Sequence, residues 1–163
     1  MKILVDVNVF IDVMTKRRGW SESLRVLNLA RRCQEIDSFT SALTVPLLYF
    51  FRRRVADEAK ARADVQAILT GLQLVPMDQA ILDFALAAAG PDFEDNIQLA
   101  SAESISVDHL ITRNKKDFAA TKLSVVNPEE WLASVKAAAF KATFHRLPGQ
   151  GLKPLDYLVG PAV

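Results

Sequence analysis

The sequence predicts an α/β fold in which a central, mostly parallel sheet of four to five strands lies between layers of helices. Two observations support this fold class. Short apolar runs typical of strands alternate along the chain with longer segments whose apolar residues recur every three to four positions, as they do in helices. The first run, residues 3–5, is apolar without interruption, which indicates a strand buried on both faces, as in a parallel sheet.

In the first half of the chain, apolar residues at positions 26, 29, 30 and 33 predict a helix over residues 22–35. We expect Cys33 in this helix to be a small buried side chain. Residues 37–41 are a weak strand candidate. An apolar helix is expected from Thr44 through Phe51, and another over residues 57–70, where Gly71 marks the end.

In the second half, residues 72–75 predict a second buried strand, and residues 77–89 a helix capped by Asp78. A helix over 93–105, strands over 109–112 and 124–126, and a last helix from Pro128 complete the pattern. We therefore expect one domain over residues 1–138. Residues 139–163 are punctuated by proline and glycine, which predicts a C-terminal extension.

The composition bounds the class of protein. With 163 residues, 50% of them apolar and 24% charged, the chain is typical of a globular protein. Its net charge is only +1, so a nucleic-acid partner would have to be held by local basic clusters. A single cysteine cannot form an internal disulfide and fits the cytoplasm. No apolar run is long enough for a signal peptide or approaches the ~18 residues of a membrane span, so no membrane association is expected.

Acidic residues come directly after the predicted strands, where a ligand site is expected, because parallel α/β sheets bind ligands at the carboxyl ends of their strands. The polar residues placed there are Asp6, Asn8 and Asp12 after the first strand, Thr112, Asn114 and Asp117 after the strand over 109–112, and Asp92, Glu94 and Asp95 at the start of the preceding helix. Crowded carboxylates stay ionised together only when a cation lies between them. Mg²⁺ and Mn²⁺ suit such oxygen ligands.

Each acid also has a purely structural interpretation. Asp6 fits a cap of the turn after the strand, and Asp92 and Asp95 fit the start of a helix, where carboxylates suit the helix dipole. Asp117 fits a surface residue in a basic loop, and Asp12 fits a solvated one. The joint placement of Asp6, Asp95 and Asp117 at one sheet edge is what favours a metal site.

Three stretches of the sequence resemble the PIN-domain family, in particular the VapC-type toxins of bacterial toxin–antitoxin pairs. Residues 3–12, with Asp6-Val7-Asn8, are similar to that family's opening strand and the helix after it. Residues 92–102 are similar to the helix with its central acidic residue, and residues 110–118 to its closing Thr-x-Asp/Asn…Asp-Phe segment. The order and spacing agree over about residues 1–135.

The resemblance implies a PIN-like three-layer α/β/α fold and an enzyme, a Mg²⁺- or Mn²⁺-dependent endoribonuclease that hydrolyses RNA phosphodiesters as the toxin of a type II pair. Its implied partners are RNA, a cognate antitoxin protein and a second copy of the chain. The site residues that it implies are Asp6, Asp95 and Asp117 as catalytic metal ligands, Asn8, Glu94, Thr112 and Asn114 in support, and Arg113, Lys115 and Lys116 as RNA-binding cations.

Two departures from the family pattern leave alternatives open. The family usually has a Glu in the helix that begins Thr44-Val45-Pro46, where this chain has Leu47 or Leu48. At the fourth acidic position stands the neutral Asn114, with Asp117 as a substitute three residues later. A single tightly held ion is therefore expected. The alternatives are a degenerate PIN domain that binds RNA or protein without cleaving, and a Mg²⁺-dependent phosphotransfer domain of the receiver or haloacid-dehalogenase type.

Overall fold

The structure is a computed structural model that describes residues 1–90, 92–118 and 121–137. Its centre is a five-stranded sheet with the order β3-β2-β1-β4-β5, in which every pair of neighbours is parallel. The strands are β1 (Lys2–Val5), β2 (Asp37–Ser41), β3 (Gln73–Val75), β4 (His109–Ile111) and β5 (Val125–Val126). The predicted sheet is thus confirmed, whereas the extension predicted over residues 139–163 lies outside the described residues.

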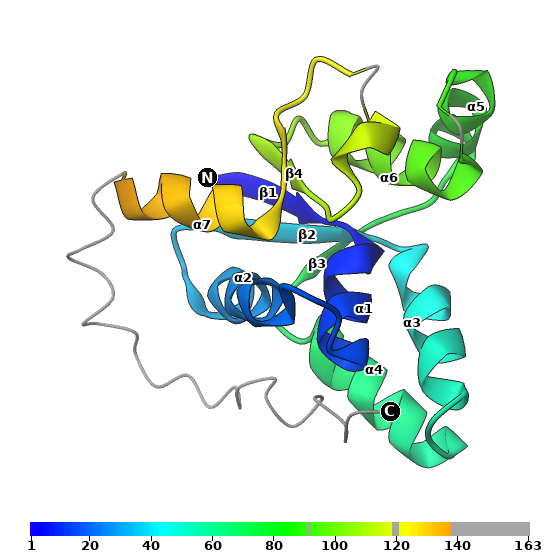
Figure 1. The fold of residues 1–163 in the computed structure, drawn as a ribbon. Coiled ribbons are helices and arrows are strands. Elements are labelled where there is room, and N and C mark those ends of the chain that lie inside the picture. The colour runs from blue at the N-terminus through cyan, green and yellow to red at the C-terminus, as the bar shows by residue number, and fades with distance from the viewer. Residues whose placement is uncertain (91, 119–120, 138–163) are drawn as a thin grey trace.

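Helices cover both faces of this sheet (Figure 1). On one side lie α1 (Val7–Thr15), α2 (Trp20–Arg32), α3 (Thr44–Arg53), α4 (Glu58–Leu69) and α7 (Pro128–Ala137), and on the other α5 (Gln79–Ala87), α6 (Phe93–Ser104) and the short 3-10 helix η1 (Lys115–Phe118). Alternation along β1 explains the layers, because Ile3 and Val5 enter the core beneath α1 and α2 while Leu4 enters the core beneath α6. Of the helices described, none is long and apolar enough to cross a membrane.

Most predicted elements are found within a few residues of their expected ends. Asp57 caps α4 by accepting a hydrogen bond from the Lys60 amide at 2.8 Å, and Asp78 caps α5 in the same way. Cys33 is buried as expected. The prediction of a buried strand over residues 72–75 is wrong, because β3 is an edge strand whose Gln73 and Leu74 are exposed.

The order of the strands creates a switch point next to β1. The chain runs from β1 to β2 and β3 on one side, then returns across the sheet to β4 and β5 on the other. The chain segments that follow β1 and β4 therefore run in opposite directions, which leaves a crevice beyond the carboxyl ends of these two strands. Parallel sheets bind their ligands in such a crevice. Val5 pairs with Ile111, and the Asp6 amide donates to the Ile111 carbonyl at 3.0 Å. This register brings the residues after both strands to the same place.

Candidate metal centre

Asp6 occupies the end of β1 and is completely buried. Its Oδ2 accepts hydrogen bonds from the Thr112 hydroxyl at 2.7 Å and from the Asn8 side-chain amide at 3.1 Å. Its Oδ1 is buried and has no hydrogen-bond partner among the described residues. Although Asp6 stands at the N-cap position of α1, its side chain makes no capping hydrogen bond.

The surroundings of Asp6 oppose its negative charge. Burial raises the pKa of its carboxyl above the ordinary value of 3.8. Hydrogen bonds from the side chains of Thr112 and Asn8, and from the backbone amides of Val7 and Asn8, act in the opposite direction without cancelling the effect. A buried acceptor without a partner costs about 1–3 kcal/mol of stability. A cation beside Oδ1 would remove both penalties, because it would neutralise the charge and occupy the free lone pairs.

The acidic residues at the start of α6 divide into two roles. Asp92 is exposed and caps the helix, where its Oδ1 accepts from the Glu94 amide at 2.7 Å and from the Asp95 amide at 3.4 Å. Asp95 turns inward and is only 9% exposed. Burial raises the pKa of Asp95 to about 7, and the charge of Asp6 is the next largest cause. The charge of Asp6 therefore acts on the Asp95 carboxyl, which indicates that the two side chains lie near each other.

Two more acids contribute to this negative region. Burial, followed by the charges of Asp6 and Asp92, raises the pKa of Glu94. The charge of Asp117 is among the causes that raise the pKa of Asp95. The surroundings therefore favour the protonated forms of Asp6, Glu94 and Asp95, and a bound cation would favour their ionised forms.

The loop after β4 is tied to Asp6 by a series of hydrogen bonds. The Thr112 hydroxyl donates to Asp6 and accepts from the backbone amide of Asn114 at 3.0 Å. The side-chain amide of Asn114 in turn donates to Oδ2 of Asp117. Phe118 is buried in the core beneath α6 and anchors the end of the loop. Asn114 therefore holds Asp117 rather than standing apart from it.

The donor set at this sheet edge suits a cation that keeps part of its hydration. Across residues 1–90, 92–118 and 121–137, no three His, Cys, Asp or Glu side chains are gathered closely enough to hold a metal ion as they stand. Mg²⁺, however, retains several waters and is commonly held by only one or two carboxylates. The free Oδ1 of Asp6, the inward Asp95 and a surrounding set of oxygen atoms fit Mg²⁺ or Mn²⁺ on those terms.

The two leucines of α3, one of which stands where the family usually has a Glu, differ in environment. Leu48 is fully buried in the core beneath α1 and α2, whereas Leu47 is partly buried at the margin of that core. A carboxylate at position 48 would lose its hydration entirely, which is costly for an unpaired charge. Of the two positions, Leu47 is the one that tolerates an acidic side chain.

We expect Leu47→Glu to tighten Mn²⁺ binding about tenfold, equivalent to about 1.4 kcal/mol, because the family resemblance implies a charged oxygen ligand at this position. Leu48→Glu serves as the matched comparison and should destabilise the fold by roughly 3 kcal/mol or more. Calorimetric titration with Mn²⁺ and thermal unfolding measure the two effects. No gain in affinity from either substitution would mean that α3 does not present this position to the site.

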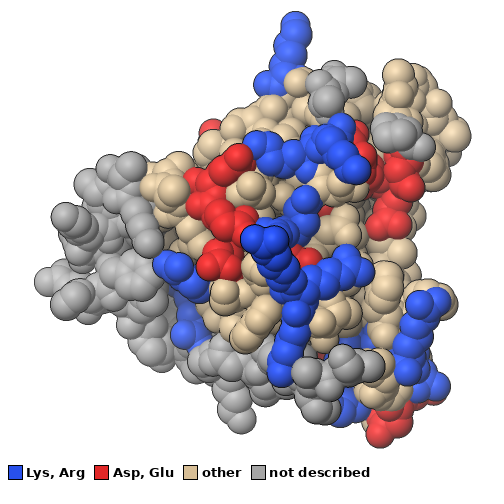
Figure 2. Space-filling view, viewed as in Figure 1, with Lys and Arg blue, Asp and Glu red and all other residues tan. Residues whose placement is uncertain are grey.

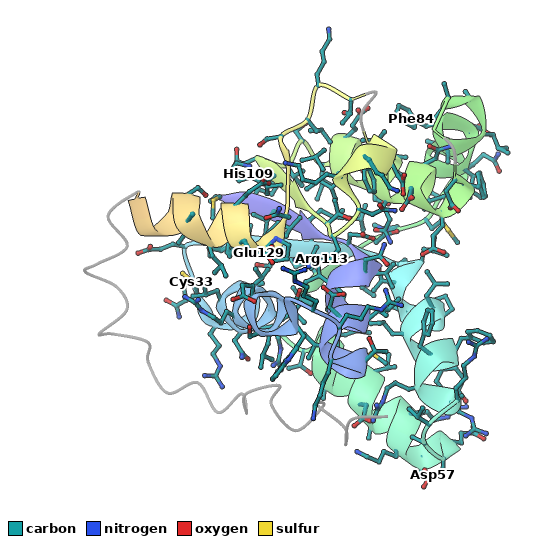
Figure 3. All side chains as sticks on the ribbon, in the orientation of Figure 1. Cys33, Asp57, Phe84, His109, Arg113 and Glu129 are labelled. Carbon is teal, nitrogen blue, oxygen red and sulfur yellow. The ribbon has the colours of Figure 1, made fainter. Side chains whose placement is uncertain are left out.

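Arg113, expected to bind RNA, is engaged inside the protein. Its Nε lies 2.9 Å from Oδ2 of Asp12, its Nη1 donates to both carboxylate oxygens of Glu129, and its Nη2 donates to the Arg18 carbonyl at 3.0 Å. Figure 3 shows Arg113 and Glu129 facing each other beside α7. Asp12 is 3% exposed and also accepts from the Ser23 hydroxyl at 3.0 Å, so its interpretation as a solvated residue is wrong.

The other two cations of that cluster differ in how they are held. Lys115 forms an ion pair with Glu130 at 2.7 Å, and Lys116 is exposed with no ion pair among the described residues. Figure 2 shows Lys and Arg side chains lying next to acidic groups on the face turned to the viewer. Among the three residues, Lys116 is therefore the cation most available to a phosphate, and Arg113 the least.

The raised pKa of Asp95 predicts how stability depends on pH in the metal-free protein. The folded chain keeps this proton to about pH 7, whereas the ordinary value is 3.8, so the folded state binds more protons between these values. Stability should therefore be highest near the lower value and fall as the pH rises towards 7. We expect a loss of about 1–2 kcal/mol, or roughly 5 °C in Tm.

Thermal unfolding at pH 5 and pH 8 tests this, with and without Mg²⁺. Asp95→Asn should flatten the dependence, and Mg²⁺ should raise Tm more at pH 8 than at pH 5, because only the ionised carboxylate attracts the ion. If Asp95→Asn leaves the dependence unchanged, the proton is held elsewhere.

Sequence reasoning missed one buried polar residue close to these acids. Gln98, one turn after Asp95 on α6, is fully buried and donates to the Thr44 hydroxyl at 3.4 Å. The signal that could have found it was a polar side chain between Ile97 and Leu99, on a helix whose neighbouring positions are apolar.

The fold and its acidic switch point define an α/β protein with a candidate cation site. The family model of the PIN domain matches residues 2–116, so the chain belongs to the PIN-domain family. This confirms the resemblance inferred from three motifs, and the receiver and haloacid-dehalogenase alternatives are set aside. A search of curated protein sequences found no significant match.

Solved structures of toxin–antitoxin proteins share this fold. The toxin–antitoxin complex from Klebsiella pneumoniae is 25% identical, with a TM-score of 0.58 and a match that covers 77% of this chain and 97% of that chain. VapBC-1 from nontypeable Haemophilus influenzae is 18% identical, with a TM-score of 0.61 over 79% and 99% of the two chains. FitAcB from Neisseria gonorrhoeae is 23% identical, with a TM-score of 0.54 over 78% and 98%.

Proposed function

We propose that this protein is a Mg²⁺- or Mn²⁺-dependent endoribonuclease and the toxin of a type II toxin–antitoxin pair. The observation that carries the proposal is Asp6, a fully buried carboxylate with one oxygen that has no partner among the described residues, placed at the switch point and acting on Asp95. Stability alone gives no reason to bury such a group. PIN domains are generally nucleases, and membership of that family gives the acids their chemistry.

In this proposal Asp6 and Asp95 would bind the ion directly, and Asp117 would bind it directly or through water. A bound Mg²⁺ or Mn²⁺ supplies charge that polarises the phosphoryl oxygens and lowers the pKa of a coordinated water. Thr112 and Asn8 fix the orientation of Asp6 through Oδ2, which leaves Oδ1 to face the ion. Glu94, whose pKa is raised, accepts a hydrogen bond from the attacking water.

The substrate phosphates require cations near the acids. Lys116 is exposed and precedes Asp117 in the chain, and in this proposal it would contact the phosphate backbone, which positions a strand without reading its sequence. Lys115 could join it by exchanging Glu130 for a phosphate. Arg113 is assigned to the same surface, although its ion pairs with Asp12 and Glu129 give it mainly the task of holding the loop after β4.

The proposed protein partner is an antitoxin encoded as the second member of the pair. The Klebsiella pneumoniae structure, which is 25% identical to this chain, is a toxin–antitoxin complex. A homodimer and a cytoplasmic location belong to the same proposal, the latter because Cys33 is a free buried thiol and the substrate is cellular RNA.

The test is RNA cleavage by the purified full-length protein after removal of trace metals. We expect single-stranded RNA to be cut internally when Mn²⁺ or Mg²⁺ is added, and to remain intact with EDTA. A DNA oligonucleotide of the same sequence is the control for substrate class. If the protein binds RNA but does not cut it in Mn²⁺, it is a degenerate PIN domain that binds RNA without cleaving. The leucine at the position of the family Glu is the reason to measure binding as well as cleavage.

A further inference from the structure

Buried polar side chains lie along one stripe of α6 on successive turns. Asp95, Gln98 and Ser101 are three residues apart and are all buried, with Gln98 and Ser101 fully inaccessible. Asp95 belongs to the candidate metal centre. The Ser101 hydroxyl donates to the Ile97 carbonyl at 2.8 Å and lies 3.1 Å from the Ser41 hydroxyl on β2, so its hydrogen-bonding capacity is satisfied by contacts that do not lead to Asp6. The burial of the polar Gln98 side chain is explained neither by the candidate metal centre nor by a hydrogen bond within α6.

Gln98 begins a chain of hydrogen bonds that crosses from α6 to β1. Its Nε2 donates to the Thr44 hydroxyl at 3.4 Å, and the hydroxyl oxygens of Thr44 and Thr40 lie 2.9 Å apart. The Thr40 hydroxyl lies within donating distance of both Thr44 and the Val5 carbonyl, the latter at 2.8 Å, and it has a single proton; when that proton goes to the carbonyl, the proton between the two threonines comes from Thr44. Each group in the chain donates onward, and such aligned chains strengthen one another in a buried environment.

The chain ends on the peptide group that carries Asp6. The Val5 carbonyl receives the Thr40 hydroxyl from one side, and the Asp6 amide of the same peptide donates to Ile111 at 3.0 Å on the other. The peptide is therefore held from both neighbouring strands. Through this chain, α6, which carries Asp95, is linked to the backbone of Asp6.

The carbonyl oxygen of the Gln98 side chain indicates that this residue does not serve stability. Its Oε1 is buried and has no hydrogen-bond partner in the described part of the chain. A buried acceptor left unpaired is unfavourable, and an apolar side chain of similar length would avoid that penalty. Retaining an amide here at a cost to stability is typical of a residue that serves a site.

We propose that Gln98 is a positioning residue that sets the placement of Asp6 relative to Asp95, and thereby the affinity of the site for its divalent ion, through Thr44, Thr40 and the Val5 carbonyl. This rests on the proposed metal-dependent function. Gln98 does not touch the ion or the substrate. It acts as outer residues around metal ligands do, where loss of one commonly weakens metal binding by about 10–100-fold.

Gln98→Met tests the proposal, with Ser101→Ala as the matched control one turn along the same stripe. Two quantities are measured on the full chain: Tm without metal, and the Kd for Mn²⁺ by calorimetry. We expect Gln98→Met to keep or raise Tm while weakening Mn²⁺ binding about tenfold. Ser101→Ala should leave the Kd unchanged. A purely structural role predicts the opposite, a lower Tm with an unchanged Kd.

A second pair keeps the test decisive if Gln98→Met fails to fold. Thr44→Val removes only the hydroxyl that joins Gln98 to Thr40, and Thr44→Ser retains it. We expect the valine variant to bind Mn²⁺ about tenfold more weakly and the serine variant to bind like the wild type. In the double variant Gln98→Met/Thr44→Val the losses should not add, because both break one chain.

The outcomes separate this inference from the proposed function. A wild-type protein that does not bind Mn²⁺ overturns the proposed function. A wild type that binds Mn²⁺, with folded Gln98→Met and Thr44→Val variants of equal affinity, overturns the positioning role alone.

Discussion

Asp6→Asn is expected to lower RNA cleavage at least about a hundredfold, or about 2.7 kcal/mol of transition-state stabilisation, without unfolding the protein. The substitution keeps the shape of the side chain and an oxygen that can accept from Thr112 and Asn8, but removes the charge that binds the ion. Because burial already disfavours that charge, the metal-free variant should be at least as stable as the wild type.

The control is Asp37→Asn, which removes an exposed carboxylate from the start of β2, at the opposite edge of the sheet. It should leave both cleavage and Mn²⁺ affinity unchanged. Rates on a labelled single-stranded RNA, with Tm measured for every variant, decide the matter. An Asp6→Asn protein that is folded and cleaves at the wild-type rate would show that the buried carboxylate has no part in catalysis.

This site was predictable from the sequence because its key residues come directly after apolar strands. Asp6 follows the apolar run over residues 3–5, and Thr112 ends the predicted strand over 109–112, so both could be assigned to the carboxyl edge before any contact was known. The pairing of Val5 with Ile111 brings Asp6 and Thr112, the residues that follow them, to the same edge of the sheet. The residue at the end of a strand is encoded locally, and such features can be recognised without tertiary information.

The parts of the fold that the sequence did not predict depend on burial that no local pattern reveals. The strand over residues 72–75 has the composition of a buried strand, but the strand order places β3 at the sheet edge. The apolar periodicity of the sequence did not predict helix α1, because its residues are buried on all sides and the helix has no distinct polar face. It was expected only from the family resemblance.

Long-range polar contacts were equally hidden. Asp12 and Arg113 form an ion pair across most of the chain, and nothing near either residue in the sequence signals the other. Gln98 reaches Thr44 from a distant part of the sequence in the same way. Such partners are set by how the layers pack, so sequence reasoning finds the residues proposed to hold the ion more readily than the residues that hold those side chains in place.

Asp117→Asn should reduce RNA cleavage more than Asn114→Ala, by at least about tenfold, or about 1.4 kcal/mol. A hard cation prefers the charge of a carboxylate to a neutral amide, and Asp117 already acts electrostatically on Asp95. Asn114 instead donates its side-chain amide to Oδ2 of Asp117, which leaves the other carboxylate oxygen for the ion or its water.

This arrangement also predicts that the two substitutions are coupled. Without Asn114 the Asp117 carboxylate keeps its charge but loses a donor that orients it, so Asn114→Ala should weaken cleavage mildly in the wild type. In an Asp117→Asn background there is no carboxylate for Asn114 to orient, so adding Asn114→Ala should lower the cleavage rate little further. Cleavage rates for both single variants and the double variant, each confirmed as folded by thermal unfolding, complete the cycle. If Asn114→Ala proves the worse single substitution, the ion is held at position 114 and Asp117 serves only to orient the amide, which reverses the roles assigned to this pair.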